Sequence, residues 1–394
     1  MFRRHWSGLP KDPSFPADLK GLGYFINDED EIRSTEDPDC YFKFFLNRNP
    51  RINERQRFAF NQALEMVIHE RLENEGLQKV TLPLGSTAED RHVPIFVSPC
   101  LMFKSRVVVI FGEPTQDLGL LAGRVASGPG GIDKGSMVSV VRVLQTQASS
   151  DVDPSPPGIV LANTGQLYWW PEGKRGVTVS ASTAIPLPSI VHHGRRHVPA
   201  LNNVPGSEDP TAHVRHVFDE VLRKITQEAA KVSVVAIGES CEIVTKYLDD
   251  EKNWLVWQDR LSSLLLLGSV YPDDELTNES FKHFLAKASR TRAYATSAEP
   301  LDAPLAPPTG NPDEGVPNLG CPCYSSAEPH HAEVILISAL GPALGYLETV
   351  AMTPDFENPP IAVPERPEPE FTEQDWGQVP EEEKPLVTRW TGEK

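Results

Sequence analysis

The chain has 394 residues, of which 39% are hydrophobic and 23% charged, and its 55 acidic and 37 basic side chains give a formal net charge of −18. This length suits one enlarged α/β domain or about two to three smaller domains, and the composition excludes fibrous and wholly disordered classes. An acidic surface repels phosphate, so we do not expect broad nucleic-acid binding through counterion release.

Residues 1–52 are rich in proline, glycine and aromatic side chains, including YFKFF at 41–45. Rings in such number favour burial, so we predict that this segment is an arm that packs on the core. A helix is predicted over 53–75, because apolar residues recur on one face from Phe60 to Leu72 and Gly76 follows.

Apolar runs and amphipathic stretches alternate through residues 105–349. Buried strands are predicted in 105–114, 158–165, 232–238, 260–268 and 292–300, and helices in 213–230, 241–250, 276–288 and 332–349, whereas 135–145 is helical or mixed. Apolar strands that alternate with helices indicate a mostly parallel sheet covered on both faces. The predicted class is therefore α/β, with one domain over 53–354.

Residues 355–394 carry eleven acids and four bases and include PERPEPEFTE and PEEEKP. This composition predicts a disordered acidic tail. No run reaches the ~20 apolar residues of a membrane helix, and MFRRHWSGLP lacks the apolar centre of a secretion signal, so we expect an intracellular chain with no membrane partner. Five scattered cysteines favour free thiols over a disulfide framework.

The sharpest chemical signal is the strand VSVVAIG followed by Glu239, Ser240 and Cys241. A serine at a tight turn between a buried strand and a helix is typical of the nucleophile elbow G-x-S-x-G, although Glu242 replaces the last glycine. In this position the helix N-terminus and the Cys241 amide can stabilise an oxyanion, with Gly112 as a second candidate donor. The alternative is that Ser240 only caps the helix.

A serine nucleophile needs an acid and a histidine later in the chain. Asp273 and Asp302 follow predicted strands, and His330 and His331 precede the last helix, so the order fits. In the alternative interpretation, these histidines are solvated or cap the helix.

Other patterns carry weaker signals. Candidate pocket residues are Glu113, Asn163, Tyr168 and Trp169, because aromatic rings beside polar turns make good ligand walls, and core packing is the equal alternative for the rings. The glycine-rich stretch 128–131 lacks a following Gly-Lys-Ser/Thr, so no phosphate-binding loop and no cofactor is predicted.

The histidines of VHHGRRH, which are His192, His193 and His197, have loose metal-like spacing. Carboxylates and cysteines are missing close by in sequence, and Cys321 and Cys323 lack a second pair. We therefore predict no metal site.

Several long motifs carry a family resemblance: FRRHWSGLPKD, GYFINDEDEIR, VVVIFGEPTQDLG, GGIDKGSMVS, GIVLANTGQLYWWPEGKR, the GES turn and GCPCYSSAEP. Over roughly residues 1–356 the chain resembles the fungal Argonaute-binding protein two domain. It is also similar to the C-terminal region of fungal class II histone deacetylases and to a metazoan family of cotranscriptional regulators.

The resemblance implies an α/β-hydrolase-like fold whose elbow position falls on Ser240. It also implies a role in Argonaute-linked heterochromatin silencing or in deacetylase assembly, in the nucleus, with the cytoplasm as a second location. The zinc-binding Asp/His pattern of the deacetylase itself is absent from this sequence. The leading hypothesis is a non-catalytic or vestigial protein-interaction module, and the alternative is a serine esterase that uses Ser240.

Overall fold

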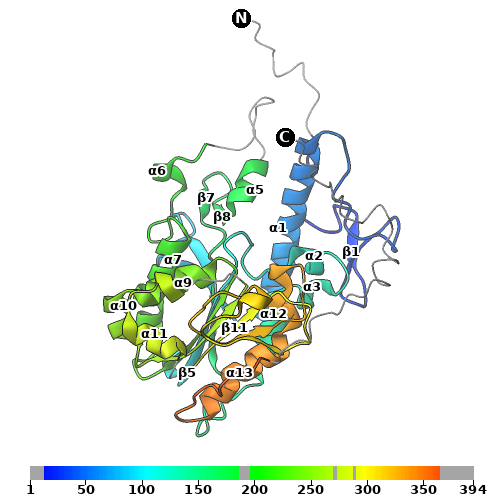
Figure 1. Cartoon of the computed structure of the whole chain (residues 1–394). Helices are drawn as coiled ribbons and strands as arrows, with labels where there is room; N and C mark the ends of the chain where they lie inside the picture. The colour runs from blue at the N-terminus through cyan, green and yellow to red at the C-terminus, as the bar shows by residue number, and fades with distance from the viewer. Residues whose placement is uncertain (1–12, 186–195, 269–272, 287–289, 364–394) are drawn as a thin grey trace, which may run out of the picture. The chain divides into compact units, whose positions relative to one another are not determined.

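A nine-stranded sheet forms the centre of the fold. The computed structural model describes residues 13–185, 196–268, 273–286 and 290–363, and its sheet has the order β12-β13-β11-β10-β9-β5-β6-β4-β3 (Figure 1). The strands are β3 (Gln78–Leu82), β4 (Val93–Val97), β5 (Arg106–Phe111), β6 (Gly158–Ala162), β9 (Lys231–Ile237), β10 (Leu261–Leu267), β11 (Thr291–Ala295), β12 (Pro304–Ala306) and β13 (Cys323–Ser325).

The six strands in the middle of the sheet run parallel. β6, β5, β9, β10, β11 and β13 pair with their neighbours in parallel, whereas β3 and β4 at one edge and β12 at the other pair antiparallel. In the register of the central strands, Val109 lies between Val160 and Val234. Every residue of β10 is buried, as expected for a strand covered on both faces. The predicted mostly parallel sheet is confirmed.

Helices cover both faces, which gives three layers (Figure 1). One face carries α7 (Pro210–His216), η3 (Val217–Leu222), α8 (Arg223–Ile225), α9 (Ser240–Asp249), α10 (Glu251–Trp257) and α11 (Glu279–Ala286). The other carries α1 (Pro50–Asn74), α4 (Met137–Gln145), α12 (Ile335–Ser338) and α13 (Leu340–Met352). Successive strand residues point to opposite faces of the sheet, so Val109 packs in the core of the first face and Ile110 in that of the second.

Helix α1 agrees with the prediction to within a few residues. Asn49 caps it by accepting a hydrogen bond from the Arg51 amide at 3.1 Å, Pro50 occupies its first turn, and Gly76 follows its end with φ +86°. Aromatic residues of the N-terminal segment lie on this helix, where the ring of Phe42 stacks on Phe60 with centroids 3.7 Å apart.

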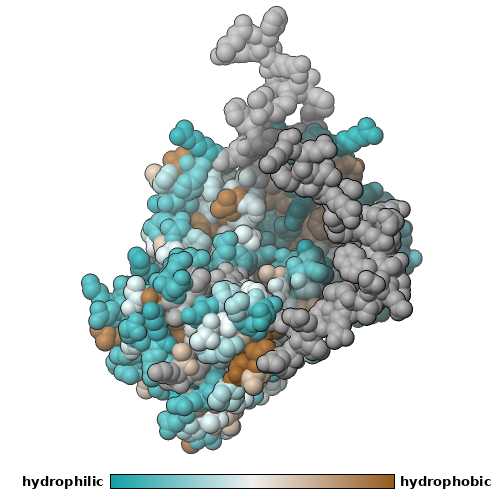
Figure 2. Space-filling view, in the orientation of Figure 1, coloured by the Kyte–Doolittle hydropathy of each residue, from teal (hydrophilic) through white to brown (hydrophobic). Residues whose placement is uncertain are grey.

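Smaller elements connect these layers. They are the hairpins β1 (Tyr24–Ile26) with β2 (Ile32–Ser34) and β7 (Tyr168–Trp170) with β8 (Arg175–Val177), and the short helices η2 (Leu101–Phe103), α2 (Gly123–Ala126), α3 (Gly131–Lys134), α5 (Val179–Ala184), α6 (Pro199–Asn202), η4 (Asp273–Glu275), η5 (Pro312–Glu314) and η6 (Ala332–Val334). Hydrophilic residues cover most of the described surface in the view of Figure 2.

Two predicted helices differ in detail. The helix predicted over 213–230 begins at Pro210 and passes through the π-helical turn η3, and its regular structure ends at Ile225. The closing helix is broken near Ala339, where the axes of its two parts meet at 65°. Within the described residues no single helix is both long and apolar enough to cross a membrane, and this bent pair meets the criterion by length and composition alone.

The chain past the closing helix is described as far as Val363. Phe356 and Ile361 pack against the core that also holds α13. The remainder of the predicted acidic tail, 364–394, lies outside the described residues.

Candidate functional site

Ser240 lies where the sequence places it, at the turn between the central strand β9 and helix α9. Gly238 leaves the strand with φ +59°, and Ser240 is the first residue of the helix. Its side chain is buried, and its hydroxyl donates a 2.6 Å hydrogen bond to the backbone carbonyl of Gly112 at the end of β5. The hydroxyl proton of Ser240 is therefore directed at a carbonyl of the neighbouring strand.

Both residues proposed as oxyanion donors form hydrogen bonds within the protein, Cys241 through its amide and Gly112 through its carbonyl. The Cys241 amide donates to the Gly238 carbonyl at 3.1 Å, and the Cys241 thiol lies 3.2 Å from the Ala236 carbonyl. Gly112 contributes its carbonyl to this region, and that oxygen also accepts from the Thr164 hydroxyl at 2.7 Å. The turn is thus closed by bonds within the protein.

Glu113 places a carboxylate over the same turn. Its Oε2 accepts a hydrogen bond from the Glu239 amide at 3.2 Å, and a side chain at Gly238 would collide with it. Burial raises the pKa of Glu113 above its ordinary value, and the hydrogen bond from the Glu239 amide offsets only part of this rise. Negative charge at this point opposes a developing oxyanion.

The candidate histidines are held by a different set of residues. Glu328 accepts hydrogen bonds from the backbone amides of His330 and His331 at 2.9 and 3.0 Å. Arg124 donates to His331 Nε2 at 2.8 Å and to Glu333 at 2.7 Å. Because arginine only donates, Nε2 of His331 is the acceptor and the proton resides on Nδ1.

The candidate acids also have other neighbours. Asp302 accepts from the Tyr294 hydroxyl at 2.6 Å and from Arg292 Nη1 at 3.2 Å, beside strands β11 and β13. Asp273 begins the short helix η4, and its side chain lies outside the described structure. Among the described residues, no hydrogen bond joins Ser240 to His330, His331 or Asp302.

Asn163 lies in a buried polar chain that the sequence analysis did not identify. The Asn163 amide N–H donates to His213 Nε2 at 3.1 Å, and the Nδ1–H of His213 donates to the Ser207 hydroxyl at 3.0 Å. Burial lowers the pKa of His213 to about 3, so this imidazole is neutral. A histidine on the apolar face of a helix was the available sequence signal.

Gln166 connects this chain to a second buried cluster. Its Nε2 donates to Glu65 Oε1 at 2.9 Å and to Asp117 Oδ1 at 3.1 Å, and Glu65 forms an ion pair with Arg175. Burial and then the charge of Glu65 raise the pKa of Asp117 to about 7. One turn further along α1, His69 donates from Nε2 to the Leu118 carbonyl at 3.1 Å. The sequence signal for this cluster was Glu65, which interrupts the apolar face of the helix.

The candidate pocket rings are buried among other side chains. Tyr168 packs with Val177 and Ile185, and Trp169 packs with Leu167 and Val204.

Part of the VHHGRRH motif is described. His192 and His193 lie in a segment outside the described residues, whereas His197 Nε2 lies 2.7 Å from the Asn203 side-chain oxygen. Within the described ranges, no group of three or more histidine, cysteine or acidic side chains is arranged to hold a metal ion.

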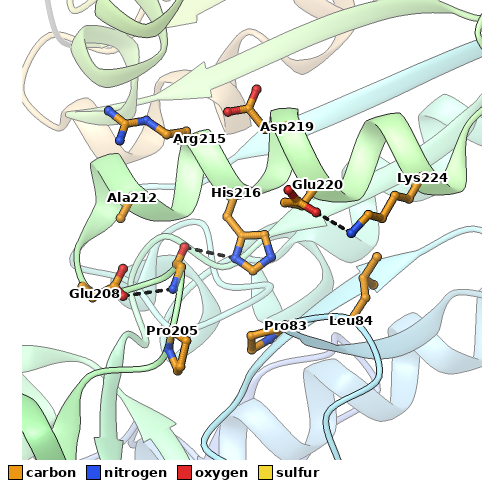
Figure 3. Close-up of a pocket in the computed structure, with 11 residues that line it drawn as sticks. Pro83, Leu84, Pro205, Glu208, Ala212, Arg215, His216, Asp219, Glu220 and Lys224 are labelled. Carbon is orange, nitrogen blue, oxygen red and sulfur yellow. Dashed lines mark hydrogen bonds and ion pairs between the residues drawn. The ribbon is translucent and has the colours of Figure 1, made fainter.

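The described surface includes two sizeable hollows. One, of about 480 Å³, lies between the segment after β3 and the helix α7–η3, where His216 Nδ1–H donates to the Gly206 carbonyl at 3.1 Å (Figure 3). Its acids are engaged within the protein, since Glu220 pairs with Lys224 and Asp219 accepts from a tyrosine. The other hollow, of about 680 Å³, lies between α1, α5 and the segment from Tyr41 to Phe44, and Asp117 lines it.

Comparisons with known proteins identify the family to which the chain belongs. The family model described as "Arb2 domain" matches residues 15–301. The chain is 23% identical over 299 residues to the "Cotranscriptional regulator ARB2A homolog" of Dictyostelium discoideum, and the match covers 73% of this chain and 70% of that protein. The resemblance expected from the motifs is confirmed: this chain belongs to the Arb2 domain family.

Proposed function

We propose that this chain is a non-catalytic, α/β-hydrolase-like module that makes protein contacts in nuclear gene regulation. Argonaute, chromatin-silencing proteins or a histone deacetylase assembly are the proposed partners. The family match and a relative described as a cotranscriptional regulator support this role. With a net charge of −18, the chain would steer basic partners toward it, which raises the rate of encounter more than the affinity.

The sheet supports the hydrolase-like part of the proposal. Apart from β12, the large sheet has eight strands, which can be numbered 1 to 8 along the chain from β3 to β13. Their order across the sheet is then 1-2-4-3-5-6-7-8, and the second strand is antiparallel to its neighbours. This order resembles that of the α/β-hydrolase sheet, in which the nucleophile follows the fifth strand, and it supports the hydrolase-like part of the proposal. Ser240 follows β9, which is the fifth strand in this numbering.

The bond between Ser240 and Gly112 is the observation that most supports a non-catalytic role. A nucleophilic serine passes its proton to a general base, and a backbone carbonyl cannot take that proton. The left-handed backbone position of the turn is Gly238, whereas an elbow places its strain on the serine. The Ser240 hydroxyl instead ties helix α9 to β5.

Affinity capture from nuclear extract tests the proposal. The full chain and its Ser240→Ala variant serve as two baits, and bound proteins are identified by mass spectrometry. We expect both baits to recover Argonaute or chromatin proteins to the same extent. Recovery of metabolic enzymes alone, or loss of the partners with the alanine variant, would contradict a non-catalytic module in gene regulation.

The alternative is a serine esterase, favoured by the position of Ser240 after the fifth strand. In that case Ser240 would be the nucleophile, with His330 or His331 as base and Asp273 or Asp302 as the orienting acid. Such an enzyme would need His331 to leave Arg124 and Ser240 to leave Gly112 before the triad could form. Covalent labelling of Ser240 distinguishes the esterase from the proposed module.

A further inference from the structure

We propose that the 680 Å³ cavity binds a nucleoside monophosphate, with the base inside the cavity and the phosphate at its arginine rim. The cavity opens beyond the carboxyl end of β5, the edge at which α/β sheets bind their ligands. The surface recedes between α5 and α1 in Figure 2. Its described lining does not include Ser240, so this inference goes beyond the proposed function.

Helix α1 supplies one wall of the cavity. Arg57, Phe58, Asn61 and Leu64 line it, and Asn61 lies four residues after Arg57, three after Phe58 and three before Leu64, which places the set on one side of the helix. The ring of Phe58 packs edge-on against Trp170 with centroids 5.9 Å apart, which fixes its orientation. In the described structure the Asn61 side-chain amide makes no hydrogen bond to protein, although the residue is half-buried.

The loop after β5 supplies the facing polar groups. Gln116 and Asp117 both line the cavity. Asp117 uses Oδ1 to accept from Gln166, which leaves Oδ2 for a ligand. Because burial raises its pKa to about 7, Asp117 can accept or donate a hydrogen bond near neutral pH.

Together these groups match the edge and the faces of a nucleobase. Amide and carboxyl side chains of the kind found at Asn61, Gln116 and Asp117 pair with the donors and acceptors on a base edge. Unstacked bases also rest on exposed aromatic rings, and Phe44 at the mouth of the cavity is 49% exposed. A purely apolar ligand would leave the polar groups of the cavity unpaired.

The cavity lining carries Arg57 and Arg124 together with the acids Glu54 and Glu333, and Arg57 supplies the positive charge for a phosphate. The Arg57 guanidinium lies 5.6 Å from the centre of the Phe44 ring and forms no ion pair within the described structure. Arg124 also lines the cavity, although its charge is partly engaged by Glu333. One monophosphate suits this limited positive charge, whereas a polynucleotide would meet the repulsion of a chain with net charge −18.

Isothermal titration calorimetry of the full chain tests the site. The probes are AMP, GMP, CMP and UMP, with the four nucleosides and inorganic phosphate titrated separately. We expect saturable binding of at least one monophosphate, weaker binding of its nucleoside and still weaker binding of phosphate alone. Absence of binding by all four monophosphates, or phosphate binding as tight as that of the nucleotide, would overturn the proposal.

Two matched pairs of variants locate the binding. Asn61→Leu should weaken the monophosphate at least about tenfold, whereas Gln62→Leu at the adjacent position outside the cavity should not. Arg57→Ala should weaken the monophosphate but not the nucleoside, and Arg48→Ala serves as its control. Binding that is unchanged in both Asn61→Leu and Arg57→Ala would refute the site. Capture of Argonaute or chromatin proteins is measured separately, so failure here leaves the proposed function standing.

Discussion

Replacing Gly238 by alanine should damage the turn beside Ser240 in two separable ways. The backbone at Gly238 has φ +59°, which L-residues adopt only at a cost of about 1–2 kcal/mol. The added methyl group would also occupy the position of the Glu113 carboxylate. Glu113 must then move, and the hydrogen bond from the Glu239 amide is lost.

The expected magnitude follows from these two effects. Loss of the Glu113 hydrogen bond and displacement of its half-buried carboxylate should cost about 1–2 kcal/mol. Gly238→Ala should therefore lower the free energy of unfolding by about 2–4 kcal/mol. In the background of Glu113→Ala the collision disappears, and the same substitution should cost only about 1–2 kcal/mol.

Urea unfolding of the wild type, the two single variants and the double variant measures this difference. A double-mutant cycle then gives the interaction between positions 238 and 113. Equal costs of Gly238→Ala with and without Glu113 would refute the predicted collision. A cost below about 0.5 kcal/mol in both backgrounds would also refute the left-handed backbone assignment.

Three further predictions concern buried polar groups. Ser240→Ala removes the hydrogen bond to Gly112 and should lower the free energy of unfolding by about 1 kcal/mol in urea titrations; an unchanged value would show that this bond does not stabilise the fold. Between pH 4 and 7 the folded state binds more protons at Asp117 than the unfolded state, so wild-type stability should fall as pH rises through this window. The free energy of unfolding of Asp117→Asn should accordingly rise by about 2 kcal/mol relative to that of the wild type between pH 5 and pH 8. Parallel curves of stability against pH for the two proteins would contradict this. Nitrogen NMR should show His213 neutral with the proton on Nδ1 down to about pH 4, and titration near its ordinary pKa of 6.5 would exclude the buried environment.

Apolar runs carried enough information to predict the centre of the sheet. β5, β9 and β10 are almost wholly buried, and valine, isoleucine and leucine accordingly dominate their sequences. β3 was not predicted, because as an edge strand with the sequence QKVTL it exposes its first residues and mixes polar with apolar side chains. β13 was not predicted either, because it has only three residues.

The environment of the candidate site depends on contacts that sequence spacing does not reveal. The turn carrying Ser240 was predicted, but its hydrogen-bond partner Gly112 lies 128 residues earlier in the chain. Likewise Gln166 joins Glu65 and Asp117, which come from segments far from it in sequence. Asp302 follows a strand, as an orienting acid would, yet it binds Tyr294, because three-dimensional packing decides which partner it meets.

Covalent labelling of the intact chain tests the structural role of Ser240 most directly. The wild type and Ser240→Ala are incubated with excess fluorophosphonate, and their intact masses are compared. A buried hydroxyl that donates to the Gly112 carbonyl should not react, so the account predicts that each protein keeps its own unlabelled mass, with no fluorophosphonate adduct on either. A stoichiometric adduct on the wild type that disappears in the alanine variant would show that Ser240 is a nucleophile and would contradict the account.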